Sequence, residues 1–473
     1  MTEHDILLQL AELLAAYRDR QTLGDCVDYL APQALQAELA LDAVGTEGDW
    51  QQVFIYIRRY LDHTIKSSHP AFVNRMWSGA NLPSILGEMA VAVANTSACT
   101  YESAPVSTLM ERYMIDEMLA LVGFHQGDGQ MTTGSSNANM IAMLTARNLA
   151  NERVQDTGLF AQSEMFACVS AEAHYSMDKA ANILGIGRDH LRKIATNSRG
   201  EMVPEALAVE IEAIQAGGGK VFFVAATAGT TVRGAYDPIQ PLLDLRDRHG
   251  FWLHVDGAWG GAVIMSTKLR QRYLAGIERV DSFTWDFHKM LGSALMCNVL
   301  LMNNRPGVLA CALAGGDGSY LFRDTDDGEV QDLGHSSLQC GRRVDSLKWF
   351  LDWKYFGRDG FARRIENYLQ LCEYAEQRVL ATAELELVAP RTSFNICFCY
   401  RCPPAVADAF NQTLRTRLYQ QGRAMIGLAY VHGRLVMRLL ITNPLIDRQE
   451  VDSFFASLLQ LGQELAAEPK FLR

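Results

Sequence analysis

The sequence has no apolar run long enough to cross a bilayer, and it has no cysteines spaced in pairs like metal ligands. The N-terminal stretch MTEHDILLQLAELLAAYRDR carries acidic and basic side chains among its leucines, where a secretory signal would have an uninterrupted apolar segment. The 10 cysteines are scattered and lie mostly inside apolar runs, which is typical of reduced thiols in a core. We therefore expect a cytoplasmic protein without a membrane segment or a metal site.

Positive charge is also scarce, since 43 Lys and Arg residues stand against 54 Asp and Glu, and the formal net charge is −11. A nucleic-acid surface needs clustered cations to displace counterions, so this balance argues against a nucleic-acid partner. It does not exclude acidic small molecules, because the local charge of a pocket decides what enters. Internal repeats and low-complexity tracts are absent as well, so we expect ordinary globular domains.

The hydrophobic periodicity changes along the chain. Residues 7–17 predict an amphipathic helix, and helical periodicity continues until short apolar strands begin to alternate with helices after about Gly134. That alternation predicts an α/β fold with a mainly parallel sheet covered by helices. The predicted strands are residues 166–170, 221–227, 251–258, 280–287 and 298–302.

Beyond about residue 355 the pattern predicts a long helix, a strand at 394–401, a helix at 404–421, a strand pair within 424–441 and a last helix. This order is typical of a smaller α+β domain. We therefore expect an N-terminal helical segment at 1–72, a large domain at 73–355 and a small C-terminal domain at 356–473.

A lysine and an aspartate each end a predicted buried strand. Lys289 ends DSFTWDFHK, at the edge of an α/β sheet where ligands usually bind, although a solvent-facing lysine would fit the same pattern. Asp256, in HVDGAWGG, carries a carboxylate that burial penalises unless a cation, a helix cap or an ion pair meets it. Pyridoxal 5'-phosphate (PLP) chemistry uses this combination, because the amine forms a Schiff base and the carboxylate keeps the pyridine nitrogen protonated.

PLP also needs an anion site for its phosphate. The segment TTGSSN, residues 132–137, precedes a helix-forming run, so its N–H groups and hydroxyls could bind an anion, although small polar residues open most helices. His174, in AHYS after the strand at 166–170, is a further candidate, with a structural role as the alternative.

Eight motifs in one order resemble the group II PLP-dependent decarboxylases, and most closely their glutamate and cysteine sulfinate branch. The motifs are HPAF at His69, TYESAPV at Thr100, AHYS at Ala173, ATAGTTVRGAYDP at Ala226, HVDGAWGG at His254, SFTWDFHKM at Ser282, LQCGRRVD at Leu338 and LLITNP at Leu439. The resemblance implies the fold type I of PLP enzymes, which is like that of aspartate aminotransferase. It also implies a homodimer with the site at the subunit interface, to which the N-terminal segment contributes.

The resemblance implies that Lys289 forms the internal aldimine with PLP, that Asp256 pairs with the pyridine nitrogen and that His174 stacks over the ring. It also implies that Ala258 packs on the opposite ring face and that Arg438 receives the substrate carboxylate. The other implied cofactor contacts are Ser135, Ser136, Asn137, Thr231 and His288.

Two stretches depart from the family pattern. Related enzymes usually have Asn-Pro before the His-Lys pair, where this chain has Asp286-Phe287, and a carboxylate near the cofactor phosphate would be repulsive unless it turns away or meets a cation. The mobile loop of the family presents a tyrosine that protonates Cα, but residues 323–337 contain none. His335 is the candidate proton donor in that loop, with a solvated loop residue as the alternative.

The resemblance implies that four residues lie at positions that neighbour the substrate side chain in the related enzymes, namely Arg75, Trp77, Ser97 and Cys99. A guanidinium there favours an acidic substrate, and an indole shortens the pocket, so aspartate or cysteine sulfinate is favoured over glutamate. We therefore expect PLP-dependent decarboxylation of an acidic L-amino acid. The alternatives are a diamino or aromatic substrate, oxidative deamination to an aldehyde, and a protein that keeps the fold without turnover.

Overall fold

A computed structural model describes residues 2–41, 47–151, 153–160, 164–316, 318–322 and 332–471. The chain divides into two compact units, which we call the large and the small unit. The large unit comprises Ala80–Gln370 and Pro390–Asn395, and the small unit comprises Met1–Gly79, Leu371–Ala389 and Ile396–Arg473. The finer three-part division expected from the sequence stays a prediction. No helix of the described residues is long and apolar enough to span a membrane.

A seven-stranded sheet forms the centre of the large unit, in the order β2-β8-β7-β6-β5-β3-β4. Its strands are β2 (Asp128–Met131), β3 (Met165–Ser170), β4 (Leu191–Ile194), β5 (Lys220–Thr227), β6 (Trp252–Asp256), β7 (Ser282–Asp286) and β8 (Asn298–Met302). Only β8 runs against the other six strands. Every residue of β3, β6, β7 and β8 is buried, as expected of strands covered on both faces. The mainly parallel α/β sheet is confirmed.

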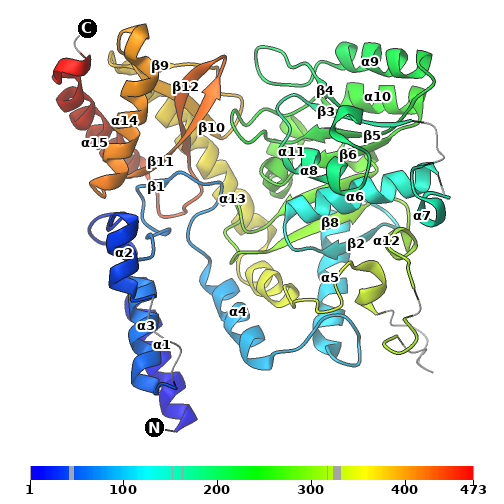
Figure 1. Cartoon of the computed structure of the whole chain (residues 1–473), viewed down its shortest axis with the longest axis horizontal. Helices are drawn as coiled ribbons and strands as arrows, with labels where there is room; N and C mark the ends of the chain where they lie inside the picture. The colour runs from blue at the N-terminus through cyan, green and yellow to red at the C-terminus, as the bar shows by residue number, and fades with distance from the viewer. Residues whose placement is uncertain are drawn as a thin grey trace. The chain divides into compact units, whose positions relative to one another are not determined.

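Helices cover this sheet. In the large unit they are α4 (Leu82–Ala94), α5 (Pro105–Val122), α6 (Ser135–Ala150), α7 (Val154–Thr157), α8 (Ser176–Ile183), α9 (Pro204–Ala216), α10 (Ile239–His249), α11 (Thr267–Tyr273), α12 (Val308–Ala312) and the first part of α13 (Ser346–Ala381), which bends at Gly357. Helix α6 packs on β5, β6, β7 and β8, whereas α9 packs on β4 and β5 and α10 on β6 (Figure 1). The left-handed Gly250 ends α10, which connects the parallel strands β5 and β6.

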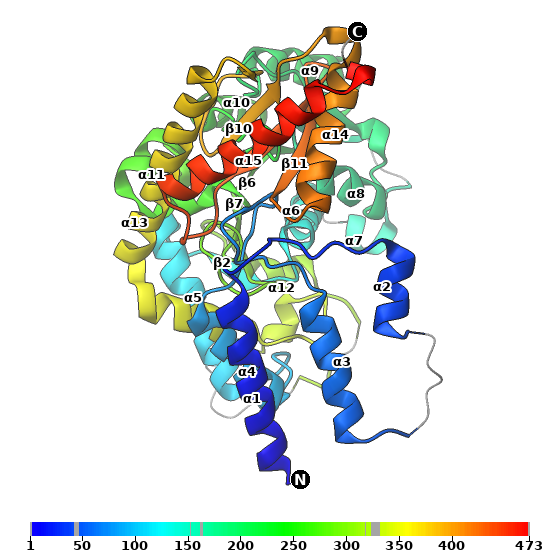
Figure 2. The ribbon, with the colours of Figure 1, turned by 90° about the vertical axis from the view of Figure 1, so that its left-hand side faces the viewer.

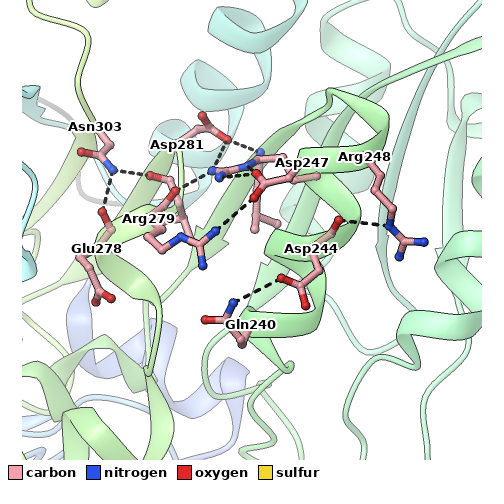
Figure 3. Close-up of polar contacts among 11 residues, drawn as sticks. Gln240, Asp244, Asp247, Arg248, Glu278, Arg279, Asp281 and Asn303 are labelled. Atoms are coloured by element: carbon pink, nitrogen blue, oxygen red, sulfur yellow. Dashed lines mark hydrogen bonds and ion pairs between the residues drawn. The ribbon is translucent and has the colours of Figure 1, made fainter.

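The edge of the sheet where β7 begins and β8 ends is held by a network of charged side chains (Figure 3). Asp281, just before β7, lies 3.5 Å from Nη1 of Arg246 and accepts the backbone N–H of Leu253. Asp247 bridges the guanidinium groups of Arg246 and Arg279 at 2.8 and 3.1 Å. These contacts fix the end of the sheet opposite the carboxyl ends of β6 and β7, where the candidate cofactor residues lie.

The small unit is built on a five-stranded sheet in the order β1-β11-β12-β10-β9. Its strands are β1 (Phe72–Val73), β9 (Leu385–Leu387), β10 (Asn395–Tyr400), β11 (Met425–Val431) and β12 (Arg434–Leu440). Its helices are α1 (Glu3–Arg20), α2 (Pro32–Leu39), α3 (Trp50–Asp62), α14 (Ala407–Gln420), α15 (Arg448–Ala466) and the end of α13. Helix α14 packs on β11, β12 and α15 (Figure 2). The predicted strand pair is confirmed as β11 and β12, joined by His432 and Gly433 at positive φ.

Candidate active site

The amino group of Lys289 is mostly buried and lies beside a charged side chain beyond the end of β7. Its Nζ is 2.9 Å from Oδ2 of Asp286, the last residue of β7. The Lys289 side chain is 18% exposed and that of Asp286 only 1%. The neighbouring His288 is also buried, with its Nε2 3.7 Å from the same carboxylate oxygen. The lysine predicted from the sequence therefore lies at a sheet edge, open enough to be reached and paired with a buried acid.

The carboxylate of Asp256 ends the adjacent strand β6 and is buried. Its Oδ2 accepts a 2.8 Å hydrogen bond from the side-chain amide of Asn139, and its Oδ1 accepts one of 3.0 Å from the backbone N–H of Ala258. Both donors are neutral, so within the described residues this buried carboxylate forms no ion pair. A buried acid held by neutral donors suits a cationic group on a ligand.

A directed chain of buried hydrogen bonds orients that carboxylate. Burial lowers the pKa of His254 to about 4, so its imidazole is neutral at physiological pH and has one donor and one acceptor. Because Asn139 donates to Asp256, its amide oxygen accepts from Nε2 of His254 at 3.0 Å. Nδ1 of His254 then accepts from the hydroxyl of Ser282 at 2.8 Å, and that hydroxyl oxygen accepts from the indole of Trp252 at 2.7 Å. Every donor therefore points towards Asp256.

The start of α6 has the form of an anion site. Gly134 adopts φ 110° just before the helix, and its N–H donates to Oδ1 of Asn298 at 2.8 Å. Asn298 in turn donates to the hydroxyl of Thr132 at 2.8 Å, which fixes the turn from both sides. No described side chain caps α6. The N–H of Asn137 already donates to the carbonyl oxygen of Gly134, so the N–H groups of Ser135 and Ser136 are the ones that can meet an anion.

His174 lies in the loop between β3 and α8, within electrostatic reach of the groups above. Burial lowers the pKa of His174, and the charge of Asp256 opposes that shift, while Lys289 and Asp286 act on it more weakly. Its Nδ1 accepts the backbone N–H of Ser176 at 3.3 Å. A neutral imidazole beside Asp256 and Lys289 has the flat, weakly polar face that stacking on an aromatic ring requires.

The other predicted cofactor residues also belong to the large unit. Ala258 is buried two residues after Asp256. The turn at Thr231 follows β5, and the amide of Asn395 holds it by donating to the backbone carbonyls of Thr231 and Val232 at 3.1 and 3.0 Å. Nδ1 of His288 lies 2.7 Å from the carbonyl oxygen of Cys297, so this ring nitrogen is already hydrogen-bonded to the backbone.

Three predicted substrate residues belong to the small unit. The Arg438 side chain is largely buried on β12, and its Nη2 donates to the backbone oxygen of Asn74 at 3.2 Å. Burial lowers the pKa of the Arg438 guanidinium, and the positive charge of Arg75 lowers it further. Trp77 packs on Phe72, with ring centroids 5.5 Å apart. The small unit therefore holds a buried guanidinium close to a second, exposed one.

Ser97 and His335 belong to the large unit. The Ser97 hydroxyl donates to the backbone oxygens of Cys340 and Arg342 at 3.1 and 3.3 Å, so it is already engaged. The exposed ring of His335 packs on the ring of Phe322, with ring centroids 4.0 Å apart. Both residues and Cys99 line a pocket of about 500 Å³. Among the described residues nothing hydrogen-bonds the His335 ring. Most of the predicted loop, residues 323–331, lies outside the described residues.

Residues 32–401 match the family model described as the pyridoxal-dependent decarboxylase conserved domain. The chain belongs to the pyridoxal-dependent decarboxylase family. It is 35% identical to the cysteine sulfinic acid decarboxylase of Mus musculus over 452 residues, which cover 93% of this chain and 91% of the relative. It is also 31% identical to an acidic amino acid decarboxylase of Homo sapiens over 452 residues, which cover 93% of this chain and 86% of the relative.

Solved structures agree with this membership. The crystal structure of mouse CSAD in apo form superposes with a TM-score of 0.92 at 32% identity, over 97% of this chain and 98% of that chain. The structure of Oryza sativa TDC with PLP and tryptamine has a TM-score of 0.90 at 24% identity and shows the shared fold alone. The fold predicted from the sequence is confirmed, and the protein is a PLP-dependent amino acid decarboxylase.

The residues on the large unit fit the cofactor of this family. The amine of Lys289 is accessible, the buried carboxylate of Asp256 has neutral donors only, and the uncapped start of α6 suits a phosphate. Sequence reasoning missed the residues that hold these groups in place. They are Asn139, His254, Ser282 and Asn298. His254 lies inside the fully buried strand β6, and Ser282 and Asn298 begin the fully buried strands β7 and β8. A polar side chain in a buried strand needs a hydrogen-bond partner, and that pattern could have identified them.

Replacing Asn139 by alanine tests the hydrogen-bond chain. The change removes one buried hydrogen bond from Asp256 and one from His254, which should cost about 1–3 kcal/mol of unfolding free energy. It should also weaken PLP binding about tenfold or more, because the carboxylate is no longer oriented. Asn148→Ala is the matched control, since Asn148 is also buried on α6 but donates to the backbone oxygen of Ala312. Equal PLP dissociation constants in the two variants would contradict a role for the chain in cofactor binding.

Proposed function

We propose that this enzyme removes the α-carboxylate of an acidic L-amino acid, namely aspartate, cysteine sulfinate or glutamate, and releases the amine and CO₂. Lys289 carries the cofactor in this proposal. One observation carries the choice of substrate. The buried guanidinium of Arg438 lies within electrostatic range of the guanidinium of Arg75. The names of the relatives, which include cysteine sulfinic acid and acidic amino acid decarboxylases, support the same choice.

The residues of the large unit would hold and tune the cofactor. PLP, when bound, supplies a conjugated ring that takes up the electron pair left by the departing carboxylate. The amine of Lys289 binds it covalently, and Asp256, fixed by Asn139, holds a proton on the ring nitrogen. The first turn of α6 binds the phosphate, and the neutral His174 covers one face of the ring. Ala258, Thr231 and His288 complete the surroundings in this proposal.

The two guanidinium groups of the small unit would recognise the substrate. Like charges close together raise each other's free energy, and a carboxylate or sulfinate relieves that repulsion while accepting paired hydrogen bonds. Arg438 binds the carboxylate in this proposal, and Arg75 meets the acidic side chain. Trp77 packs on Phe72 and adds bulk, which supports aspartate or cysteine sulfinate over glutamate.

After loss of CO₂, a proton donor that reaches Cα would give the amine, whereas its absence would favour oxidation to an aldehyde. His335 is the proposed donor, and its support is a ring that no described residue hydrogen-bonds. The second candidate function is oxidative deamination to an aldehyde with consumption of oxygen. It is favoured by the lack of tyrosine between Arg323 and Ser337.

A homodimer with the site at its interface remains part of the proposal. Helix α1 buries none of its residues in the chain, and α3 buries only Phe54. Helices α1 and α3 instead expose large apolar side chains, which is typical of subunit interfaces. They are Leu7, Leu8, Trp50, Val53, Ile55, Tyr56 and Tyr60.

Aerobic turnover of the PLP-loaded enzyme tests this function. The panel is aspartate, glutamate, cysteine sulfinate, cysteate, 2,4-diaminobutyrate, lysine and aromatic amino acids, with CO₂, amine and peroxide measured together. We expect equal amounts of amine and CO₂ from an acidic substrate, and Arg75→Gln should raise its KM. Turnover of basic or aromatic substrates alone would overturn the acidic preference, and peroxide with aldehyde would establish the second candidate.

A further inference from the structure

Asp286 is a buried acid that the proposed chemistry leaves unused. It ends β7 opposite Asn298 of β8 and is 1% exposed. Neither of its carboxylate oxygens accepts a hydrogen bond of good geometry among the described residues. A carboxylate so far from water is costly unless a nearby positive charge balances it.

Lys289 is the group that balances this charge. Its Nζ lies 2.9 Å from Oδ2 of Asp286, whereas Nε2 of His288 is 3.7 Å away. Burial lowers the pKa of His288 in spite of the nearby carboxylate, so this imidazole is neutral at physiological pH. The negative charge of Asp286 is therefore directed at one atom, the nitrogen that the proposed function assigns to the cofactor.

The titratable groups around this pair are neutral or hold contacts of their own. His174 and Cys297 come within electrostatic range of Asp286, and Lys348 acts on His288. The groups that act in turn on His174 or Cys297 are Asp256, Lys179, Asp345 and Asp352. Burial keeps His174 and Cys297 in their neutral forms. Lys348 is paired with Asp345 at 2.7 Å, and Asp352 accepts hydrogen bonds from Ser293 and Asn81 at 2.5 and 2.9 Å. The proposed function assigns Asp256 to the ring nitrogen of the cofactor. Asp286 is therefore the carboxylate that balances the charge of Lys289.

We propose that Asp286 keeps the Lys289 nitrogen protonated while that nitrogen is bonded to the cofactor, which makes the linkage more reactive towards the amine of an incoming substrate. This inference rests on the proposed function, because it takes Lys289 as the attachment point. An opposite charge within hydrogen-bond distance favours the protonated form of a nitrogen and raises its pKa. The protonated linkage therefore persists to higher pH than it would beside a neutral side chain.

The pH dependence of the cofactor's visible absorbance tests this without any measurement of activity. The protonated and unprotonated linkages absorb at different wavelengths, so a spectral titration of the PLP-loaded protein gives the midpoint pH. We expect Asp286→Asn, which is isosteric and neutral, to lower that midpoint by about one pH unit or more. Asp286→Ala should also lower the midpoint pH, so it provides a second test if the Asp286→Asn protein does not fold.

The chain offers a matched control. Asp345 and Lys348 form a second buried acid–lysine pair three residues apart in the sequence, with their charged atoms 2.7 Å apart. Asp345→Asn therefore removes a buried carboxylate that pairs with Lys348, which keeps Glu88 at 3.0 Å, and not with Lys289. Its midpoint should equal that of the wild type. Unchanged or raised midpoints in both Asp286 variants would overturn the inference while leaving the proposed function intact. A wild-type protein that forms no covalent PLP absorbance, or forms it equally after Lys289→Ala, would instead overturn the proposed function.

Discussion

Replacing Lys289 by alanine should lower decarboxylation by at least about 10³-fold, because covalent capture of the cofactor is lost with the amine. The same change removes the cation from the buried Asp286, so the apo protein should also lose about 3–5 kcal/mol of stability. Turnover under saturating PLP and chemical denaturation of the apo protein measure the two effects separately.

A double variant separates chemistry from folding. Lys289→Ala with Asp286→Asn removes both charges of the pair and should regain much of the lost stability while remaining inactive. Lys179→Ala is the control for loss of a nearby lysine, because its Nζ lies over the exposed ring of Tyr175 and forms no part of the Lys289 pair. Decarboxylation by the refolded double variant at wild-type rates would refute the role of Lys289.

Glu111→Ala should destabilise the protein by about 3–5 kcal/mol, because it leaves the buried guanidinium of Arg342 without a negative charge to balance it. Glu111 on α5 and Arg342 are both buried and form two hydrogen bonds, one of them 2.8 Å from Nη1 to Oε2. Both residues also bind the backbone of Met131, through its N–H at 2.9 Å and its carbonyl at 3.0 Å. The pair therefore anchors the strand that leads into the proposed phosphate turn.

Denaturant titration with matched variants measures this effect. Glu278→Ala breaks the partly exposed pair with Arg270, whose atoms are 3.3 Å apart, and should cost at most about 1 kcal/mol. PLP affinity should fall in Glu111→Ala and stay unchanged in Glu278→Ala. Similar losses of stability in the two variants would mean that the buried pair contributes no more than a surface one.

The sequence located the candidate cofactor groups because strand ends can be read locally. Asp256 ends the buried strand β6, Lys289 lies three residues beyond the end of the buried strand β7, and the carboxyl ends of parallel strands meet at one edge of a sheet. The pairing of Asn139 with Asp256 could not be read in this way, since the two residues are far apart in sequence and meet only when α6 packs on β6.

The strand β1 and the partner of Asp286 also could not be predicted from the sequence, because both depend on contacts that form only in the folded chain. The two-residue strand β1 has no periodicity of its own, and it exists because it pairs in parallel with β11 at the other end of the chain. The departure at Asp286 was visible in the sequence as a charge that needs a cation. Its partner, Lys289, became evident only from the 2.9 Å contact.

Reduction of the PLP-loaded protein with borohydride, followed by peptide mass mapping, tests the central claim most directly. Reduction fixes the cofactor on whichever amine holds it. The account predicts the added pyridoxyl mass on the peptide that contains Lys289, and its loss in Lys289→Ala. A pyridoxyl group on another lysine, or none on any peptide of a protein that decarboxylates its substrate, would contradict the account.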